Sequence, residues 1–104
     1  MTHSKYSVVI SSRAETMLVQ HVTFLSRVSI SAAKKLSVAF QSSLRELEQT
    51  PERFPFLVLD GIPTGLYRKC LFYNRYELIF LIIERTVYID AVRDCRQNPE
   101  NLIS

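Results

Sequence analysis

The residues best suited to chemistry lie in the C-terminal third of the chain, over residues 65–97. Arg68 and Arg96 carry planar guanidinium groups, which bind phosphate through paired hydrogen bonds and keep their charge at every working pH. Glu77 and Tyr88 can accept or donate a proton beside such an anion. These residue types predict a surface that binds an anion and moves protons without a cofactor.

Three β-rich runs position these side chains, at about Leu66–Phe72, Arg75–Ile83 and Thr86–Asp94. Only two residues separate successive runs, so the pattern predicts a tight antiparallel meander. The two turns are expected at Tyr73-Asn74 and at Glu84-Arg85. The charged residues are therefore carried on strands that lie side by side.

The alternation of side chains along these strands predicts two unlike faces. On the core face, Ile82 is expected to face Val87, Phe80 to face Ile89 and Leu78 to face Ala91. The opposite face is expected to mix charges with exposed aliphatics, carrying Arg68, Cys70, Glu77, Ile79, Leu81, Tyr88, Asp90 and Asp94. Aliphatic residues ringed by charges predict a concave surface that meets a partner.

The N-terminal half predicts one strand and two amphipathic helices. Tyr6–Ile10 is short and β-branched, as a strand requires. Ser12, with Glu15 three residues later, matches a capping box at the start of a helix over Arg13–Leu25. A second helical pattern runs through Ala33–Leu47 and stops where a proline follows. The sequence predicts an α+β fold, β-α-α-β-β-β, with this helical hairpin packed on one face of the meander.

Composition limits the class of protein. With 104 residues, 47% of them hydrophobic, the chain suits one compact domain, 1–104. The formal charge of +3 and the pI near 9.1 favour an anionic partner.

The longest apolar run, Leu78–Ile83, is far shorter than the roughly 20 residues that span a bilayer, so we expect no membrane segment. Cys70 and Cys95 are predicted to be reduced thiols of a cytoplasmic protein. His3 and His21 have no companion at ligand spacing, which predicts no metal site.

The order of elements and several local motifs resemble the RelE/ParE family of bacterial toxins, the toxic halves of type II toxin–antitoxin modules. Tyr6–Ile10 with the following Arg13-Ala14 is similar to the family's first strand and helix start, and Pro51–Pro55 is similar to its Pro-x-x-Phe-Pro stretch. The Tyr-Arg-Lys and Arg-Tyr-Glu-Leu-Ile-Phe strands and the ending Val87–Gln97 extend the resemblance over nearly the whole chain. The resemblance implies a cytoplasmic toxin that a cognate antitoxin neutralises.

Members of this family either cut mRNA on the ribosome or inhibit DNA gyrase. The resemblance implies a metal-independent mRNA endoribonuclease in which Arg68, Glu77 and Arg96 are the candidate catalytic residues, and Lys69, Tyr88 and Arg93 the candidate substrate-binding residues. Arg68 keeps a basic position of the nuclease branch, whereas Cys70 and Glu77 stand where that branch has two further basic residues. We favour mRNA cleavage because the basic surface and Arg68 suit phosphate binding.

Other interpretations of the same residues stay open. The chain is alternatively a DNA gyrase inhibitor of the ParE kind, or a catalytically inactive toxin-fold protein that only binds its partner. Arg68 and Glu77 are alternatively a cross-strand ion pair on a solvated face. The Arg-Asp-Cys-Arg sequence at Arg93–Arg96 is alternatively an internal salt-bridge cluster.

Overall fold

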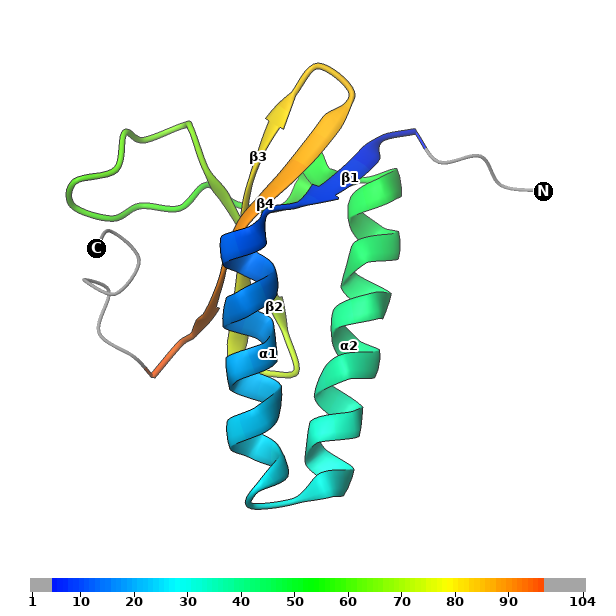
Figure 1. Ribbon diagram of the computed structural model, residues 1–104. Coiled ribbons are helices and arrows are strands. Elements are labelled where there is room, and N and C mark those ends of the chain that lie inside the picture. The colour runs from blue at the N-terminus through cyan, green and yellow to red at the C-terminus, as the bar shows by residue number, and fades with distance from the viewer. Residues whose placement is uncertain (1–4, 97–104) are drawn as a thin grey trace.

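The computed structural model describes residues 5–96. Its elements, in chain order, are β1 (Ser7–Ile10), α1 (Ser12–Ser26), α2 (Ile30–Gln49), the 3-10 helix η1 (Pro51–Arg53), β2 (Arg68–Phe72), β3 (Tyr76–Ile83) and β4 (Thr86–Asp94). The predicted β-α-α-β-β-β order is confirmed, with α1 and α2 forming an antiparallel helical hairpin (Figure 1).

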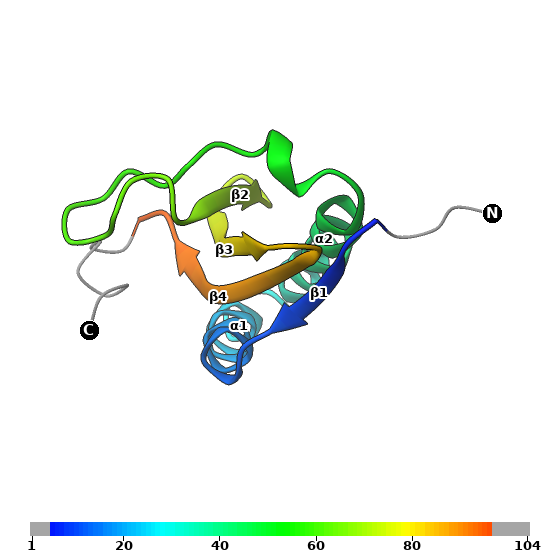
Figure 2. The same cartoon turned by 90° about the horizontal axis from the view of Figure 1, so that it is seen from above.

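The four strands form one mixed sheet in the order β1-β4-β3-β2. β2, β3 and β4 pair as the predicted antiparallel meander, and β1 pairs in parallel with β4 at the far edge. Seen from above, the two helices lie on one side of the sheet, and the irregular segment between η1 and β2 passes on the other side (Figure 2). Parallel neighbours need a crossover connection, and the one from β1 to β4 contains both helices as well as β2 and β3.

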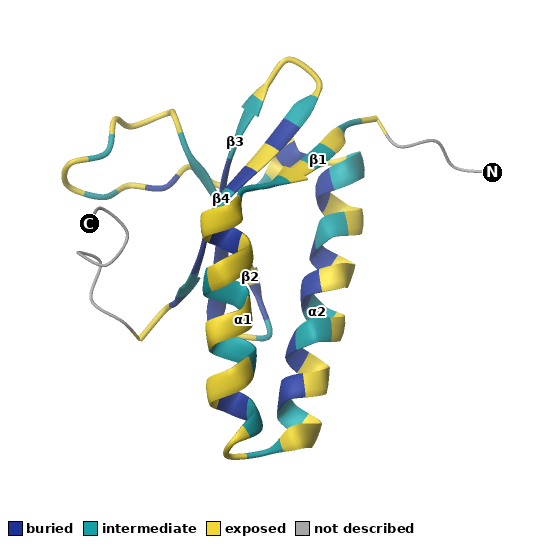
Figure 3. Cartoon of the chain, viewed as in Figure 1, coloured by how far each residue is buried: buried dark blue, intermediate teal, exposed yellow. Residues whose placement is uncertain are grey.

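The main core lies between the sheet and the helical hairpin, on what we call the core face. The buried residues of α2 recur at helical spacing, so that one stripe of the helix faces the sheet (Figure 3). The hairpin covers a layer of strand residues that includes Leu78, Phe80, Val87, Ile89 and Val92, each 0% exposed. The predicted core face is confirmed for Phe80 and Ile89 and for Ile82 and Val87, which are direct partners across β3 and β4.

A β-bulge between Ile79 and Phe80 changes the pairing further along these strands. Asp90 is the additional residue on β4, because Ile89 pairs with Phe80 whereas Ala91 pairs with Ile79. The predicted pairing of Leu78 with Ala91 is therefore wrong, and Leu78 faces Val92. Beyond the bulge, Val92 points to the core and Ala91 to the opposite face of the sheet, which we call the second face.

The turn between β2 and β3 contains three residues, Tyr73 to Arg75, because Phe72 pairs with Tyr76. The two-residue turn predicted here is wrong, and the additional residue reverses the faces of β2 relative to β3. Cys70 now lies opposite Leu78 in the core. Arg68 lies opposite Phe80 on the same face, so neither residue belongs to the second face as predicted.

Ile79 is not the exposed aliphatic residue of the second face that the alternation predicted, whereas Leu71, which pairs with Glu77, is exposed on this face. Ile79 is only 3% exposed because Leu57, from the irregular segment, packs on it together with Ala91. The Leu57 N–H donates to the carbonyl of Tyr67, which closes this segment onto itself above the sheet. The chain thus covers part of its own second face and leaves open the part around Glu77.

The first helix is capped by Ser11, and the prediction of Ser12 as the cap is wrong. The Ser11 hydroxyl accepts from the Ala14 N–H at 3.0 Å and itself donates to the carbonyl of Asp90 at 3.2 Å. Ser11 has extended backbone angles, whereas Ser12 is already helical. Glu15 lies one position later than a capping box would need.

Ser11→Ala should therefore destabilise the fold by about 1–2 kcal/mol, because it removes an N-cap and a bond to the bulge. Ser12→Ala, the matched control, should change stability by less than about 0.5 kcal/mol. Chemical denaturation of the two variants measures the difference. A larger loss for Ser12→Ala than for Ser11→Ala would restore the original assignment.

Candidate functional site

Four of the six predicted site residues share the second face of the sheet. Lys69 lies across from Ile79 in the register, and Glu77 lies directly across from Arg93. Tyr88 lies further along β4, before the bulge, and is 38% exposed. The strands therefore bring Lys69, Glu77 and Arg93 close together, with Tyr88 on the same face at a greater distance.

A hollow of about 390 Å³ opens beside this group, and we call it the second-face hollow. Its lining residues are Phe54, Pro55, Lys69, Leu71, Glu77 and Cys95. Glu77 is 8% exposed, and one of its carboxylate oxygens accepts a hydrogen bond from the Cys95 thiol at 3.2 Å. The carboxylate is thus held in one orientation at the inner wall of the hollow.

The two cations of this face have capacity for a ligand. Within residues 5–96, the Lys69 ammonium makes no hydrogen bond or ion pair, although its backbone N–H donates to Pro55. Arg93 Nε is buried and has no hydrogen-bond partner among the same residues. A buried donor without a partner is costly unless a ligand or water satisfies it. Two cations around a carboxylate can bind an anion and place a base beside it.

Arg68 is already engaged by the protein. Its Nη1 donates to the carbonyl of Glu52 at 3.0 Å and to that of Phe54 at 2.7 Å. The guanidinium also lies over the Phe56 ring, 4.0 Å from its centroid. Arg68 therefore holds the irregular segment against the edge of β2. The predicted cross-strand ion pair with Glu77 is wrong, because the register places these two residues on opposite faces.

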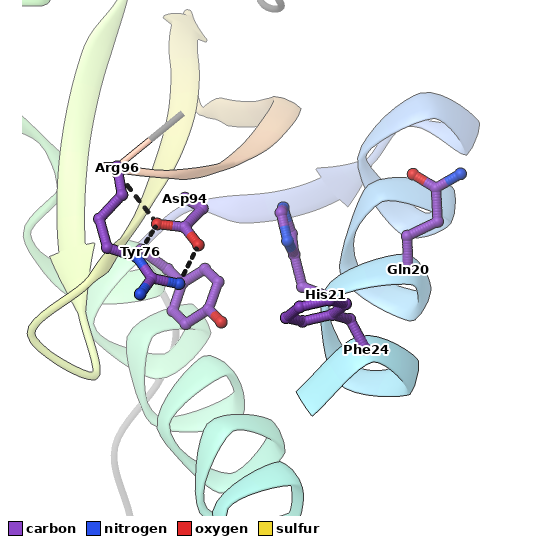
Figure 4. Close-up of a pocket in the computed structure, with 6 residues that line it drawn as sticks. All are labelled: Gln20, His21, Phe24, Tyr76, Asp94 and Arg96. Atoms are coloured by element: carbon purple, nitrogen blue, oxygen red, sulfur yellow. Dashed lines mark hydrogen bonds and ion pairs between the residues drawn. The ribbon is translucent and has the colours of Figure 1, made fainter. Parts of the chain in front are cut away.

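Arg96 lies at the opposite end of the sheet, in a cluster around Asp94. Arg96 Nη2 is 3.1 Å and Arg75 Nη2 is 3.4 Å from the same Asp94 oxygen (Figure 4 shows Arg96 and Asp94). The Asp94 carboxylate also accepts from the Arg96 backbone N–H at 2.9 Å. The interpretation of this sequence as a salt-bridge cluster is confirmed for Asp94 and Arg96, with Arg75 as a member that the sequence did not reveal. It is wrong for Arg93, which pairs with Glu77 on the second face.

Arg68 and Arg96 do not converge on one anion. Arg68 pairs in register with Phe80, whereas Asp94, which binds Arg96, pairs with Tyr76. Four strand residues separate these two positions, a distance of about 13 Å at the usual rise. The two arginines predicted to be catalytic therefore lie at separate places, away from the second-face hollow.

The sequence did not reveal Cys95 as a neighbour of Glu77. Only the strand register reveals this contact. Arg93 pairs with Glu77, and Cys95, two residues later, is on the same face of the sheet. Cys70 and Cys95 are both free thiols, as predicted, and they lie on opposite faces of the sheet.

The Cys95 thiol should react slowly although it is exposed. The pKa of Cys95 is raised from 9.0 to about 11. The larger cause is partial burial of the sulfur atom, and the second is its hydrogen bond to Glu77. At pH 8 the thiolate population of Cys95 is then about 100-fold below that of an unperturbed thiol. A thiolate of higher pKa is more nucleophilic, which offsets part of this difference. We therefore expect iodoacetamide to alkylate Cys95 about tenfold more slowly than it alkylates glutathione. Mass spectrometry of samples taken over time measures this rate.

Glu77→Gln should accelerate this alkylation, because it removes the carboxylate charge that opposes thiolate formation. Cys70, 1% exposed, should remain unmodified in the folded protein and so reports unfolding. A Cys95 rate equal to that of glutathione in the unaltered protein would contradict the described thiol environment.

Two further properties concern the described part of the chain. Neither helix in residues 5–96 combines the length and the apolar composition that crossing a membrane requires. Within that range, no group of three or more His, Cys, Asp and Glu residues is arranged to hold a metal ion. His3 lies outside the described residues.

Comparison with known proteins rests on fold alone. A scan of protein-family models finds no match, and a search of curated proteins finds no significant one. Among solved structures, the chain is similar to one described as "Chromosomal ParDE TA system from P. aeruginosa", with a TM-score of 0.67 and 14% sequence identity. The match covers 86% of this chain and 96% of the other. The class defined by fold and site is therefore a small α+β protein with the fold of a ParDE system chain and a charged second face.

Proposed function

We propose that this chain is the toxin half of a type II toxin–antitoxin module, active when its cognate antitoxin is absent. The observation that carries the proposal is the likeness of its fold to a chain of a ParDE system over 86% of its length. The motifs that resemble the RelE/ParE toxins are spread over that same length. The net charge of +3 also suits a protein whose partner and target are anionic.

For the mechanism, mRNA cleavage on the ribosome is the activity that the second face supports best. Cleavage through the 2′-hydroxyl needs a base for that hydroxyl, a cation for the phosphate and an acid for the leaving oxygen. Lys69 and Arg93 supply cations, and the Glu77 carboxylate between them is the candidate base. The Lys69 ammonium is the candidate acid that gives a proton to the leaving oxygen. Tyr88 is the candidate for stacking on an RNA base, because it is the exposed aromatic of this face.

The role of Arg68 in this mechanism differs from that of the second-face cations. Its donors to Glu52 and Phe54 fix the segment that forms one wall of the hollow. Arg68 then acts by positioning Phe54 and Pro55, and Arg96 acts through the Asp94 cluster that ends β4. Contact between either residue and RNA remains a prediction from the resemblance.

Gyrase inhibition is the second candidate, and the ParDE description of the similar structure favours it. Expression of the chain alone, followed by separate measurements of protein synthesis, DNA replication and mRNA integrity, distinguishes the candidates. Early loss of protein synthesis with fragmented mRNA supports cleavage, whereas arrested replication with intact mRNA supports gyrase inhibition. Normal growth would contradict the toxin proposal and favour the inactive binding protein.

The antitoxin has its own test. Co-expression with the protein encoded next to this chain should restore growth and should raise the thermal midpoint of the purified chain, because a ligand that binds only the folded state stabilises it. Equal thermal midpoints with and without that protein would count against a cognate pair.

A further inference from the structure

A second cavity lies on the other side of the sheet, against the first helix, and we call it the α1 pocket. Its volume is about 460 Å³, and its lining residues are Gln20, His21, Phe24, Tyr76, Asp94 and Arg96 (Figure 4). Asp94 and Tyr76 pair across the ends of β4 and β3 on the core face, whereas Glu77 is on the second face. The α1 pocket is therefore separate from the second-face hollow.

The floor of the α1 pocket is firmly held. His21 Nε2 is 3.0 Å from the carbonyl of Val92, and the His21 ring meets Tyr76 edge-on, with centroids 5.2 Å apart. The Arg75 guanidinium lies over the Tyr76 ring, 5.3 Å from its centroid. Tyr76 is 1% exposed, so this arrangement belongs to the packed core and is present before any ligand binds.

The charges of the α1 pocket do not cancel. Arg96, which lines the pocket, and Arg75, which is not a lining residue but binds the same Asp94 carboxylate, together leave an excess of one positive charge at this cluster. Each guanidinium has five N–H donors, and the bonds to Asp94 use only part of them. The Arg96 side chain is 63% exposed, so its remaining donors are accessible. A second carboxylate can complete this cluster.

The wall formed by α1 consists of Gln20, His21 and Phe24, and Phe24 is its exposed apolar residue. Phe24 is 60% exposed, an unusual state for a phenylalanine, and it lies beside the charged cluster across the pocket. A free inorganic anion would use the arginines and leave Phe24 in water. A peptide segment with an apolar side chain next to an acidic one matches both walls at once.

We propose that the α1 pocket receives such a segment of the partner protein, with an acidic side chain bound to Arg75 and Arg96 and an apolar side chain packed on Phe24. The inference rests on the proposed function in taking that partner to be the antitoxin. It assigns the anchor to the core side of the sheet, so that binding here does not require contact with the second-face hollow.

Titration calorimetry with the purified chain and the purified protein encoded next to it tests the proposal. Phe24→Ser and Arg75→Gln should each raise Kd at least about tenfold. Their matched controls are Val38→Ser, at another exposed apolar position, and Arg53→Gln, at another ion-paired arginine, which should change Kd less than about twofold. Arg75→Gln should also weaken the dependence of Kd on salt.

Several results would overturn the proposal. Equal Kd values for all four variants would place the interface elsewhere, and thermal melts show whether any loss reflects unfolding instead. Stabilisation of the chain by inorganic phosphate that Arg75→Gln abolishes, with unchanged Kd for the partner, would make the pocket an anion site. Failure of the neighbouring protein to bind the unaltered chain would also overturn it.

Growth assays separate this inference from the proposed function. Phe24→Ser, expressed alone, should arrest growth like the unaltered chain but should be rescued less by the partner. If the unaltered chain causes no arrest and the Kd values still change as predicted, the toxin assignment fails and the pocket assignment stands. If arrest occurs and the Kd values do not change, the reverse conclusion follows.

Discussion

Phe80→Ala should lower the free energy of unfolding by about 3–5 kcal/mol. Phe80 is 0% exposed, lies in the middle of β3 and meets the Phe54 ring edge-on at 6.1 Å between centroids. Removal of the Phe80 ring leaves a cavity between the sheet and the helical hairpin. It also removes the ring contact with Phe54, at the start of the irregular segment between η1 and β2. Because domains of this size are stable by only about 5–15 kcal/mol, the variant should be largely unfolded at 37 °C.

Phe24→Ala is the matched control, because it removes the same side chain from an exposed position and should change stability by less than about 0.5 kcal/mol. Urea denaturation of the two variants gives the comparison. Loss of growth arrest in Phe80→Ala would reflect unfolding and would carry no information on chemistry. A fully stable Phe80→Ala protein is incompatible with the described core.

Lys69→Ala and Arg93→Ala should each reduce mRNA cleavage by about 10²–10³-fold if the second face holds the scissile phosphate. Removing one preorganised donor to a developing negative charge has an effect of this size in enzymes. Both residues are part-exposed on strands, so the folded state should survive the substitutions. The measurements are growth arrest and the integrity of messenger RNA after induction, with thermal melts of the purified variants.

Lys35→Ala and Arg27→Ala remove the same charges from exposed positions of the helical hairpin and serve as controls. Glu77→Gln keeps the size of the side chain and should abolish cleavage only if the carboxylate is the base. Undiminished arrest in both Lys69→Ala and Arg93→Ala would exclude the second face as the site of action. Loss of replication arrest in these variants, with intact messenger RNA throughout, would assign the same face to gyrase.

Local sequence patterns were sufficient for the elements of this protein. The 3.6-residue period of α2 and the β-branched runs of β3 and β4 arise from interactions between residues close in the chain. The two-residue turn at Glu84-Arg85 is equally local, and the pairs that follow it, such as Ile82 with Val87, were predicted correctly. These patterns placed five of the six candidate residues on the three C-terminal strands but did not decide which of them share a face.

The sequence by itself therefore determined the order of the helices and strands, the central core at Phe80 and the concentration of charge on the C-terminal strands. Only the tertiary structure decided which charges meet. One additional residue in the turn before β3 and the bulge at Asp90 each reverse the faces that follow, and neither has a marker in the local pattern. The pairing of β1 with β4, the cover of Leu57 over Ile79 and the binding of Arg68 to Phe54 join residues distant in the chain. Such contacts are selected by packing of the whole fold, because no short segment contains both partners.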